Sequence, residues 1–140
     1  MYLFRARDPN YILVASSLAF AVPSLVAYTH EQYLTSQICS LLMMSSIQFH
    51  GQPSLLSFLL DQLMILLFVV RGIYVGYLLG FYGLLVAAFL NGYSIFIYYG
   101  PWSHSFAYHP NYYIGSLWHG SIHVIIAFTY AAAQPFLTDK

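Results

Sequence analysis

The chain has 140 residues, of which 60% are hydrophobic and only 6% are charged, whereas soluble domains carry about 25% charged residues. So few charges cannot cover the surface of a water-soluble globule, which excludes that class and indicates an integral membrane protein. The four basic and four acidic side chains cancel. The charge balance therefore predicts no nucleic-acid partner, because phosphate binding requires a basic patch.

Five apolar stretches follow in chain order, each near the length of about 20 residues with which a helix spans a bilayer. They are Asn10 to Tyr28, Glu31 to Gln52, Pro53 to Arg71, Ile73 to Tyr99 and Tyr112 to Gln134. All five are apolar around most of their circumference, so length rather than periodicity carries the assignment. We therefore expect an all-α fold, a polytopic transmembrane bundle of about five membrane helices, with residues 1–140 forming a single integral membrane domain.

Two of these stretches leave alternatives open. The first follows Arg5 and Arg7 and is too long for the hydrophobic region of a signal peptide, so we interpret it as a retained membrane helix; cleavage near Ala19 to Ala21 is the alternative. The fourth contains three glycines that are either close helix contacts or breaks that divide it into shorter helices. These glycines are Gly76, Gly80 and Gly83.

Short connections at Thr29 and His30, at Gly51 to Pro53 and at Arg71 and Gly72 predict antiparallel neighbours. Alternating crossings then place the N-terminus, the Gly51 to Pro53 turn and the loop Gly100 to Asn111 on one side of the membrane, called side A. The C-terminus lies on the opposite side B. Basic residues are equally frequent on both sides, so the positive-inside rule does not decide the orientation. Those residues are Arg5 and Arg7 on side A, and Arg71 and Lys140 on side B.

Amphipathic aromatic side chains gather near side A, where they suit the headgroup level of a bilayer. We interpret them as an interfacial belt, and three histidines near helix ends or in the long loop as interfacial or solvated. The aromatic residues are Tyr93, Tyr98, Tyr99, Trp102, Tyr108, Tyr112 and Tyr113, and the histidines are His30, His104 and His109.

Asp61 is the one charged residue far from any expected helix end. A carboxylate at the centre of a membrane helix costs about 2.5 to 3.5 kcal/mol on insertion scales, so it normally faces the bundle interior and has a partner. The polar groups expected at the same depth include histidines. We therefore expect Asp61 to lie beside histidine side chains.

His119 and His123 are four residues apart, so both rings leave one face of the last helix about 6 Å from each other. With this spacing one helix can supply two nitrogens to one metal ion. Ser46 and His50 are also one turn apart, and the helical rise of about 1.5 Å per residue places both pairs and Asp61 in one layer toward side A. Hydrogen-bonded interior histidines, with Asp61 serving helix association or a proton path, are the other interpretation.

One pattern becomes recognisable beside "HGSIH" in the last helix: Ser46, a Phe-His pair ending at His50, then ten residues, then Asp61 in "FLLDQL". It resembles the alkaline ceramidases and their superfamily of membrane hydrolases, which also includes adiponectin-type receptors, GPI-anchor remodelling factors and myomaker-like proteins. The resemblance covers the second, third and last helices, under half of the chain. Members of that family usually have seven membrane helices, two more than are expected here.

The resemblance implies three zinc ligands, His50, His119 and His123, with Ser46 and Asp61 near the zinc-bound water. It implies hydrolysis of a lipid amide or ester, with ceramide favoured, in the endoplasmic reticulum or Golgi. The segment "GSLWHGSIH" aligns with the family in two registers. In the second register Gly115 replaces one ligand and the site is incomplete.

A rival hypothesis belongs to a different class. The short chain with few soluble loops also suits a non-catalytic structural or accessory subunit that retains a degenerate hydrolase core. Its partners would then be a larger membrane protein complex as well as membrane lipids, for example in an organellar inner membrane. A proton or ion path is less favoured, because only one carboxylate lies at depth.

Overall fold

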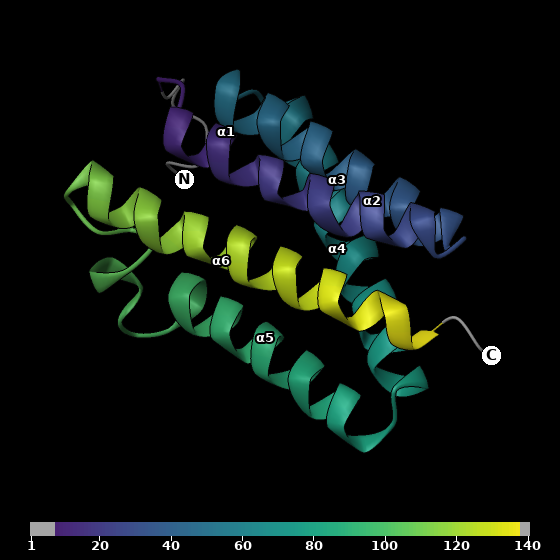
Figure 1. Ribbon diagram of the computed structural model, residues 1–140. Coiled ribbons are helices and arrows are strands. Elements are labelled where there is room, and N and C mark those ends of the chain that lie inside the picture. The colour runs from purple at the N-terminus through teal and green to yellow at the C-terminus, as the bar shows by residue number, and fades with distance from the viewer. Residues whose placement is uncertain (1–7, 138–140) are drawn as a thin grey trace.

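Residues 8–137 are described by a computed structural model, in which they form helices joined by short turns and one longer loop, with no strand in that range (Figure 1). The α-helices are α1 (Tyr11–Ser17), α2 (Ala21–Thr29), α3 (Tyr33–Gly51), α4 (Leu55–Leu78), α5 (Phe81–Tyr99) and α6 (Tyr112–Ala133). Short 3-10 helices cover Leu18–Phe20, Ser103–Ser105 and Gln134–Leu137. The expected all-α bundle is confirmed. The terminal residues used above for orientation, Arg5, Arg7 and Lys140, lie outside the described range.

The first membrane segment is one rod from Tyr11 to Thr29, formed by α1, the 3-10 turn and α2. The change of helix type has a local cause. Pro23 has no N–H with which to bond the carbonyl of Ala19 four residues earlier, so the helical hydrogen-bond ladder is interrupted there. The predicted boundaries of this segment agree with the structure to within one residue.

The predicted boundary between the third and fourth helices is wrong. Helix α4 continues through Arg71 and Gly72 to Leu78, and the chain reverses at Gly80, whose φ of 78° favours glycine. The Arg71 side chain does not need a helix end, because its Nε donates to Thr35 Oγ1 at 2.9 Å. Residues 73–78 therefore belong to α4, and the remainder is the single helix α5.

The other two glycines of this region form a close helix crossing. A Cβ atom on Gly76 would lie 2.9 Å from the carbonyl oxygen of Gly83, and one on Gly83 would lie 2.5 Å from that of Gly76. Real Cβ atoms do not approach backbone oxygens so closely, so α4 and α5 can touch here only without side chains. Both alternatives for the glycines are thus realised, a break at Gly80 and a contact between its neighbours.

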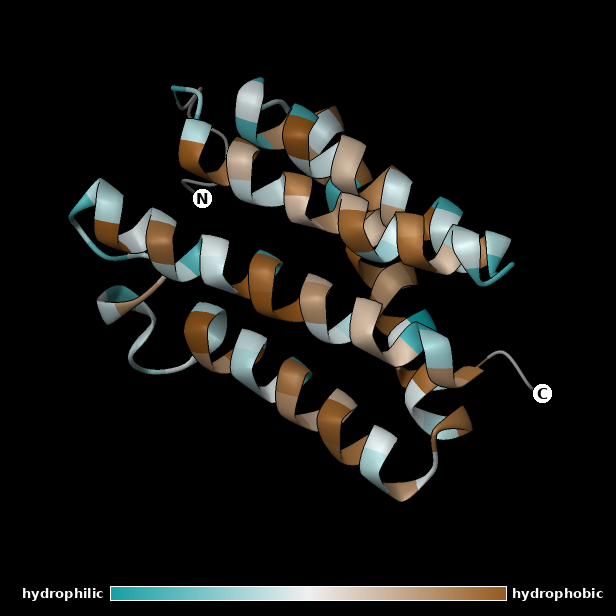
Figure 2. Cartoon of the chain, viewed as in Figure 1, coloured by the Kyte–Doolittle hydropathy of each residue, from teal (hydrophilic) through white to brown (hydrophobic). Residues whose placement is uncertain are grey.

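Four helical segments are long and apolar enough to cross a membrane, which agrees with an integral membrane protein. They are Tyr11–Thr29, Leu55–Leu78, Phe81–Tyr99 and Tyr112–Leu137. Helix α3, the fifth expected span, is less apolar, and polar colours interrupt the brown along it in Figure 2. Its polar residues are largely turned inward, since Thr35, Ser45, Ser46 and His50 are all buried.

The helices alternate in direction as expected. The start of α1, the end of α3 and the loop between α5 and α6 lie at one end of the bundle, and the α2–α3 and α4–α5 turns lie at the other (Figure 1). Helix α3 packs against α1, α2 and α4, while α6 packs against α1 and α2. Side A, where the candidate site residues were expected, is therefore the end at which α1 begins and α3 ends.

We expect Gly83→Ala to lower the free energy of unfolding by about 1–3 kcal/mol, because the added methyl group overpacks the contact with α4. Gly92 is the control, since a Cβ atom there would meet no atom within 4 Å; Gly92→Ala should be neutral or slightly stabilising through helix propensity. Thermal or detergent-induced unfolding followed by circular dichroism measures the difference. Equal stability of the two variants would contradict the close crossing.

Candidate metal centre

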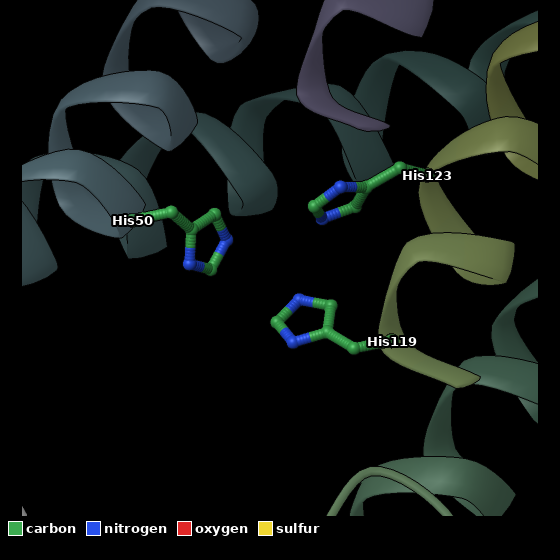
Figure 3. A group of neighbouring side chains, drawn as sticks. All are labelled: His50, His119 and His123. Carbon is green, nitrogen blue, oxygen red and sulfur yellow. The ribbon is translucent and has the colours of Figure 1, made fainter. Parts of the chain in front are cut away.

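Three histidines from two helices converge near side A. His50 lies in the last turn of α3, and His119 and His123 lie one turn apart on α6. Each offers one ring nitrogen, and these nitrogens lie within 4.8 Å of one another. One nitrogen of each ring faces the space between the three rings (Figure 3). His50 and His123 are buried and His119 is half-buried.

This donor set fits a transition-metal ion. Three neutral imidazoles are the ligands of several catalytic zinc sites, and they also suit copper, iron and nickel. A tetrahedral ion with bonds of about 2.0 to 2.1 Å holds its ligand nitrogens about 3.3 Å apart. The ring nitrogens, within 4.8 Å of one another, therefore move closer together when they bind such an ion. Three histidine ligands leave a fourth position for water or substrate.

The expected carboxylate lies close by but has different partners. Asp61, 3% exposed, accepts hydrogen bonds at Oδ1 from Ser46 Oγ at 2.5 Å and from Ser45 Oγ at 3.3 Å. We expected histidines as its partners; in the described part of the chain the hydrogen bonds to Asp61 come from serines. Helices α3 and α4 pack closely at this point, so even the short serine side chain on α3 reaches the carboxylate on α4 directly.

Ser46 connects the carboxylate to the histidine cluster. It lies one turn before His50 on the buried face of α3 and is itself 2% exposed. Residues four apart are neighbours on a helix surface. Ser46 is therefore a neighbour of His50 on α3 and at the same time bonds the Asp61 carboxylate on α4. Ser46 and Asp61, expected in one layer, face each other across the Gly51 to Pro53 turn.

An aromatic ring packs against each histidine. The centroid distances are 5.1 Å between Phe49 and His50, 4.8 Å between Tyr98 and His119, and 5.6 Å between Phe20 and His123. Tyr98 was assigned to the interfacial belt, but it is half-buried and meets His119 nearly edge to face, with an interplanar angle of 80°. Apolar walls of this kind restrict water and rotation of the imidazoles.

The two registers proposed for the last helix assign different residues as ligands, and these residues lie in different places in the structure. His119 and His123 join His50, whereas Gly115 is buried against the long loop, where a Cβ atom would lie 3.1 Å from the Ala107 carbonyl oxygen. Gly115 is thus a packing position at the loop. The other histidines are outside the cluster, as expected: His30 ends α2, His104 lies in a 3-10 turn, and His109 Nδ1 accepts from the Asn111 N–H at 2.9 Å.

Sequence reasoning missed three contributors to the site. Ser45 is the second donor to Asp61, Ser16 is hydrogen-bonded to His123 Nδ1 at 2.9 Å, and the Asn10 N–H donates to the His50 carbonyl at 2.8 Å. A signal was present in the sequence: Ser16 and Ser17 are polar residues inside the apolar first stretch, where each hydroxyl requires a partner. The identity of those partners depends on which helices are neighbours.

Comparison of the chain with known protein families, with curated proteins and with solved structures finds no match. The resemblance to the ceramidases therefore rests on the motif residues quoted above.

We expect the purified protein to bind about one divalent transition-metal ion per chain and His119→Ala to lose most of it, because two imidazoles hold the ion much more weakly than three. Elemental analysis after dialysis measures the ratio. His104→Ala is the control, since His104 lies in the loop outside the cluster. Retention of metal in His119→Ala, or equal loss in both variants, would contradict this site.

Proposed function

We propose that this protein is a zinc-dependent membrane hydrolase that cleaves a lipid amide or ester, similar to the alkaline ceramidases. The proposal is carried by one observation: a cluster of three histidines inside an apolar helical bundle, in which Ser46, one helical turn from His50, bonds the buried carboxylate of Asp61. Ionisable groups at membrane depth are costly and are functional by default. A lipid substrate follows from the location, because its scissile group can reach this depth from the bilayer.

In this proposal His50, His119 and His123 hold the ion through one nitrogen each. A bound Zn²⁺ polarises a substrate carbonyl and acidifies water. The chain itself supplies the orientation of the three rings, through helix α6, the end of α3 and the packed aromatic side chains. The ceramidase resemblance favours zinc among the ions that suit imidazole.

Asp61 is the proposed general base. Ser46 Oγ donates to Oδ1, and Ser45 Oγ shares its one hydrogen between Oδ1 and the Leu42 carbonyl. No hydrogen bond in the described part of the chain reaches Oδ2. Oδ2 is therefore the oxygen that can take a proton from water and pass it to the leaving amine or alcohol, the usual role of a positioned carboxylate. The hydrogen bonds to Oδ1 fix the direction in which Oδ2 points.

Ser46 has two roles in this scheme. While Asp61 is ionised, the Ser46 hydroxyl donates to it and orients the carboxylate. Once Asp61 carries a proton, the carboxyl group accepts more weakly, because charge-assisted hydrogen bonds are about twice as strong as neutral ones. The hydroxyl can then rotate and donate to the oxyanion that develops on the substrate, as a preorganised donor would.

We expect Asp61→Asn to lower lipid amidase or esterase activity by about 10²- to 10⁴-fold, the usual contribution of a general base, while zinc binding is retained. Asp8→Asn is the matched control, because Asp8 is an exposed carboxylate outside the bundle. Turnover of short-chain ceramide and of a matched ester, together with metal content, provides the measurement. Full activity of Asp61→Asn in a zinc-loaded protein would exclude this base.

A second candidate function is a non-catalytic accessory subunit of a larger membrane complex, in an organellar inner membrane. One observation favours it: α5 has a single buried residue, Ile97, and most of its other apolar side chains are exposed. Lipid can also cover such a surface, so the exposed apolar face does not require a protein partner. The accessory-subunit alternative also gives no reason for three histidines to converge beside a bonded carboxylate. The hydrolase is therefore the better supported proposal.

The two candidates predict different behaviour during native purification. We expect the hydrolase to run as a small particle in mild detergent and to carry zinc, because its site is completed within one chain. An accessory subunit would leave the membrane only in a large assembly and without stoichiometric metal. Native gel electrophoresis combined with metal analysis of the same band distinguishes them, and a metal-free large assembly would reject the hydrolase.

A further inference from the structure

Ser16 of α1 touches the histidine cluster from outside. Its Oγ lies 2.9 Å from His123 Nδ1 and donates to the Leu13 carbonyl at 3.0 Å. The Nδ1 atom is the ring nitrogen of His123 that points away from the space between the three rings (Figure 3). Ser16 is therefore placed behind the candidate ligand, on the side opposite to the ion.

The tautomer of His123 decides the direction of the bond between Ser16 and His123. A serine hydroxyl has one hydrogen and two lone pairs. When that hydrogen is donated to the Leu13 carbonyl, which can only accept, Ser16 Oγ accepts from His123, and the proton of the neutral ring is on Nδ1. In that tautomer Nε2 carries a lone pair and faces the cluster, as a metal ligand must.

Two features bring α1 close enough for this contact. Gly120, between the two histidines on α6, leaves room for Ser16: a Cβ atom there would lie 3.2 Å from Ser16 Oγ and 3.3 Å from Ser16 Cβ. Asn10 fixes the start of α1, because its N–H donates to the His50 carbonyl at 2.8 Å and its Nδ2 donates to Ser116 Oγ at 2.8 Å. Helix α1 is thus bonded to both helices that supply the histidines.

We propose that Ser16 is a positioning residue of the metal centre, which holds His123 in the tautomer and orientation that present Nε2 to the ion. The proposal rests on the metal site proposed above and adds α1, which supplies no ligand, to the structure that forms it. Outer hydrogen-bond partners of ligating histidines typically change metal affinity by about 10- to 100-fold. Ser16 has the position and the hydrogen-bonding pattern of such a partner.

The residue after Ser16 in α1 provides a matched control. Ser17 is fully buried, and its hydroxyl donates to the same Leu13 carbonyl at 2.8 Å. In the described part of the chain the Ser17 hydroxyl forms no hydrogen bond with a histidine, so Ser17→Ala removes a similar hydroxyl from the same helix and leaves the cluster intact. The comparison of Ser16→Ala with Ser17→Ala separates a general loss of helix packing from a specific effect on the metal site.

The experiment titrates the metal-free full-length protein in detergent with Zn²⁺ against a competing chelator, and with Co²⁺ followed by its visible absorption spectrum. We expect Ser16→Ala to weaken Zn²⁺ binding by about 10- to 100-fold and to change the Co²⁺ spectrum. Ser17→Ala should stay within about threefold of the unchanged protein. Circular dichroism establishes that the helix content of all variants is equal.

A second pair of variants keeps the test valid if Ser16→Ala folds poorly. Gly120→Ala should displace Ser16 and weaken Zn²⁺ binding while every hydroxyl is kept, whereas Gly92→Ala, with no atom within 4 Å of the added group, should not. Unchanged affinity and spectrum in both Ser16→Ala and Gly120→Ala, or equal losses in Ser17→Ala, would overturn the role of Ser16. Absence of Zn²⁺ binding by the unchanged protein would instead reject the metal site itself.

Discussion

Polar side chains inside this bundle have no bulk water to bond, and this constraint organises the structure. An unsatisfied buried donor or acceptor costs about 1 to 3 kcal/mol, and several hydroxyls and the carboxylate are paired across helices. Ser46 bonds Asp61 between α3 and α4, Ser16 bonds His123 between α1 and α6, and Thr35 accepts from Arg71 near the other end of α3 and α4. The apolar composition makes each of these pairs specific, because few alternatives exist.

The same pairs explain why the candidate site lies at one end of the bundle. There the start of α1 meets the end of α3, and the Asn10 N–H bonds the His50 carbonyl. Helix α6 passes alongside α1 with two histidines on one face. The site is therefore assembled from three helices joined through Asn10, which bonds His50 of α3 and Ser116 of α6. Such preorganisation reduces the reorganisation needed to bind an ion.

Helix α5 relates to this site differently from the other helices. It crosses α4 at the glycine contact and touches α6 less extensively, and only Ile97 is buried along it. Its contribution to the site is Tyr98, which packs against His119. The helix with the fewest buried residues thus covers the half-buried histidine.

The sequence by itself determined the class, the number of long helices and the candidate cluster. Long apolar stretches must cross a bilayer as helices, and residues four apart share a helical face, so His119, His123, Ser46 and His50 could be placed without coordinates. Only the tertiary structure decided the end of α4, the partners of Asp61 and the contact of Ser16 with His123. Arg71 was expected at a helix end, because the sequence does not reveal that Thr35, 36 residues away, accepts its hydrogen bond inside the bundle. The pairing of side chains depends on which helix faces lie together. In a chain that is apolar on nearly every face, the sequence pattern does not specify which faces these are.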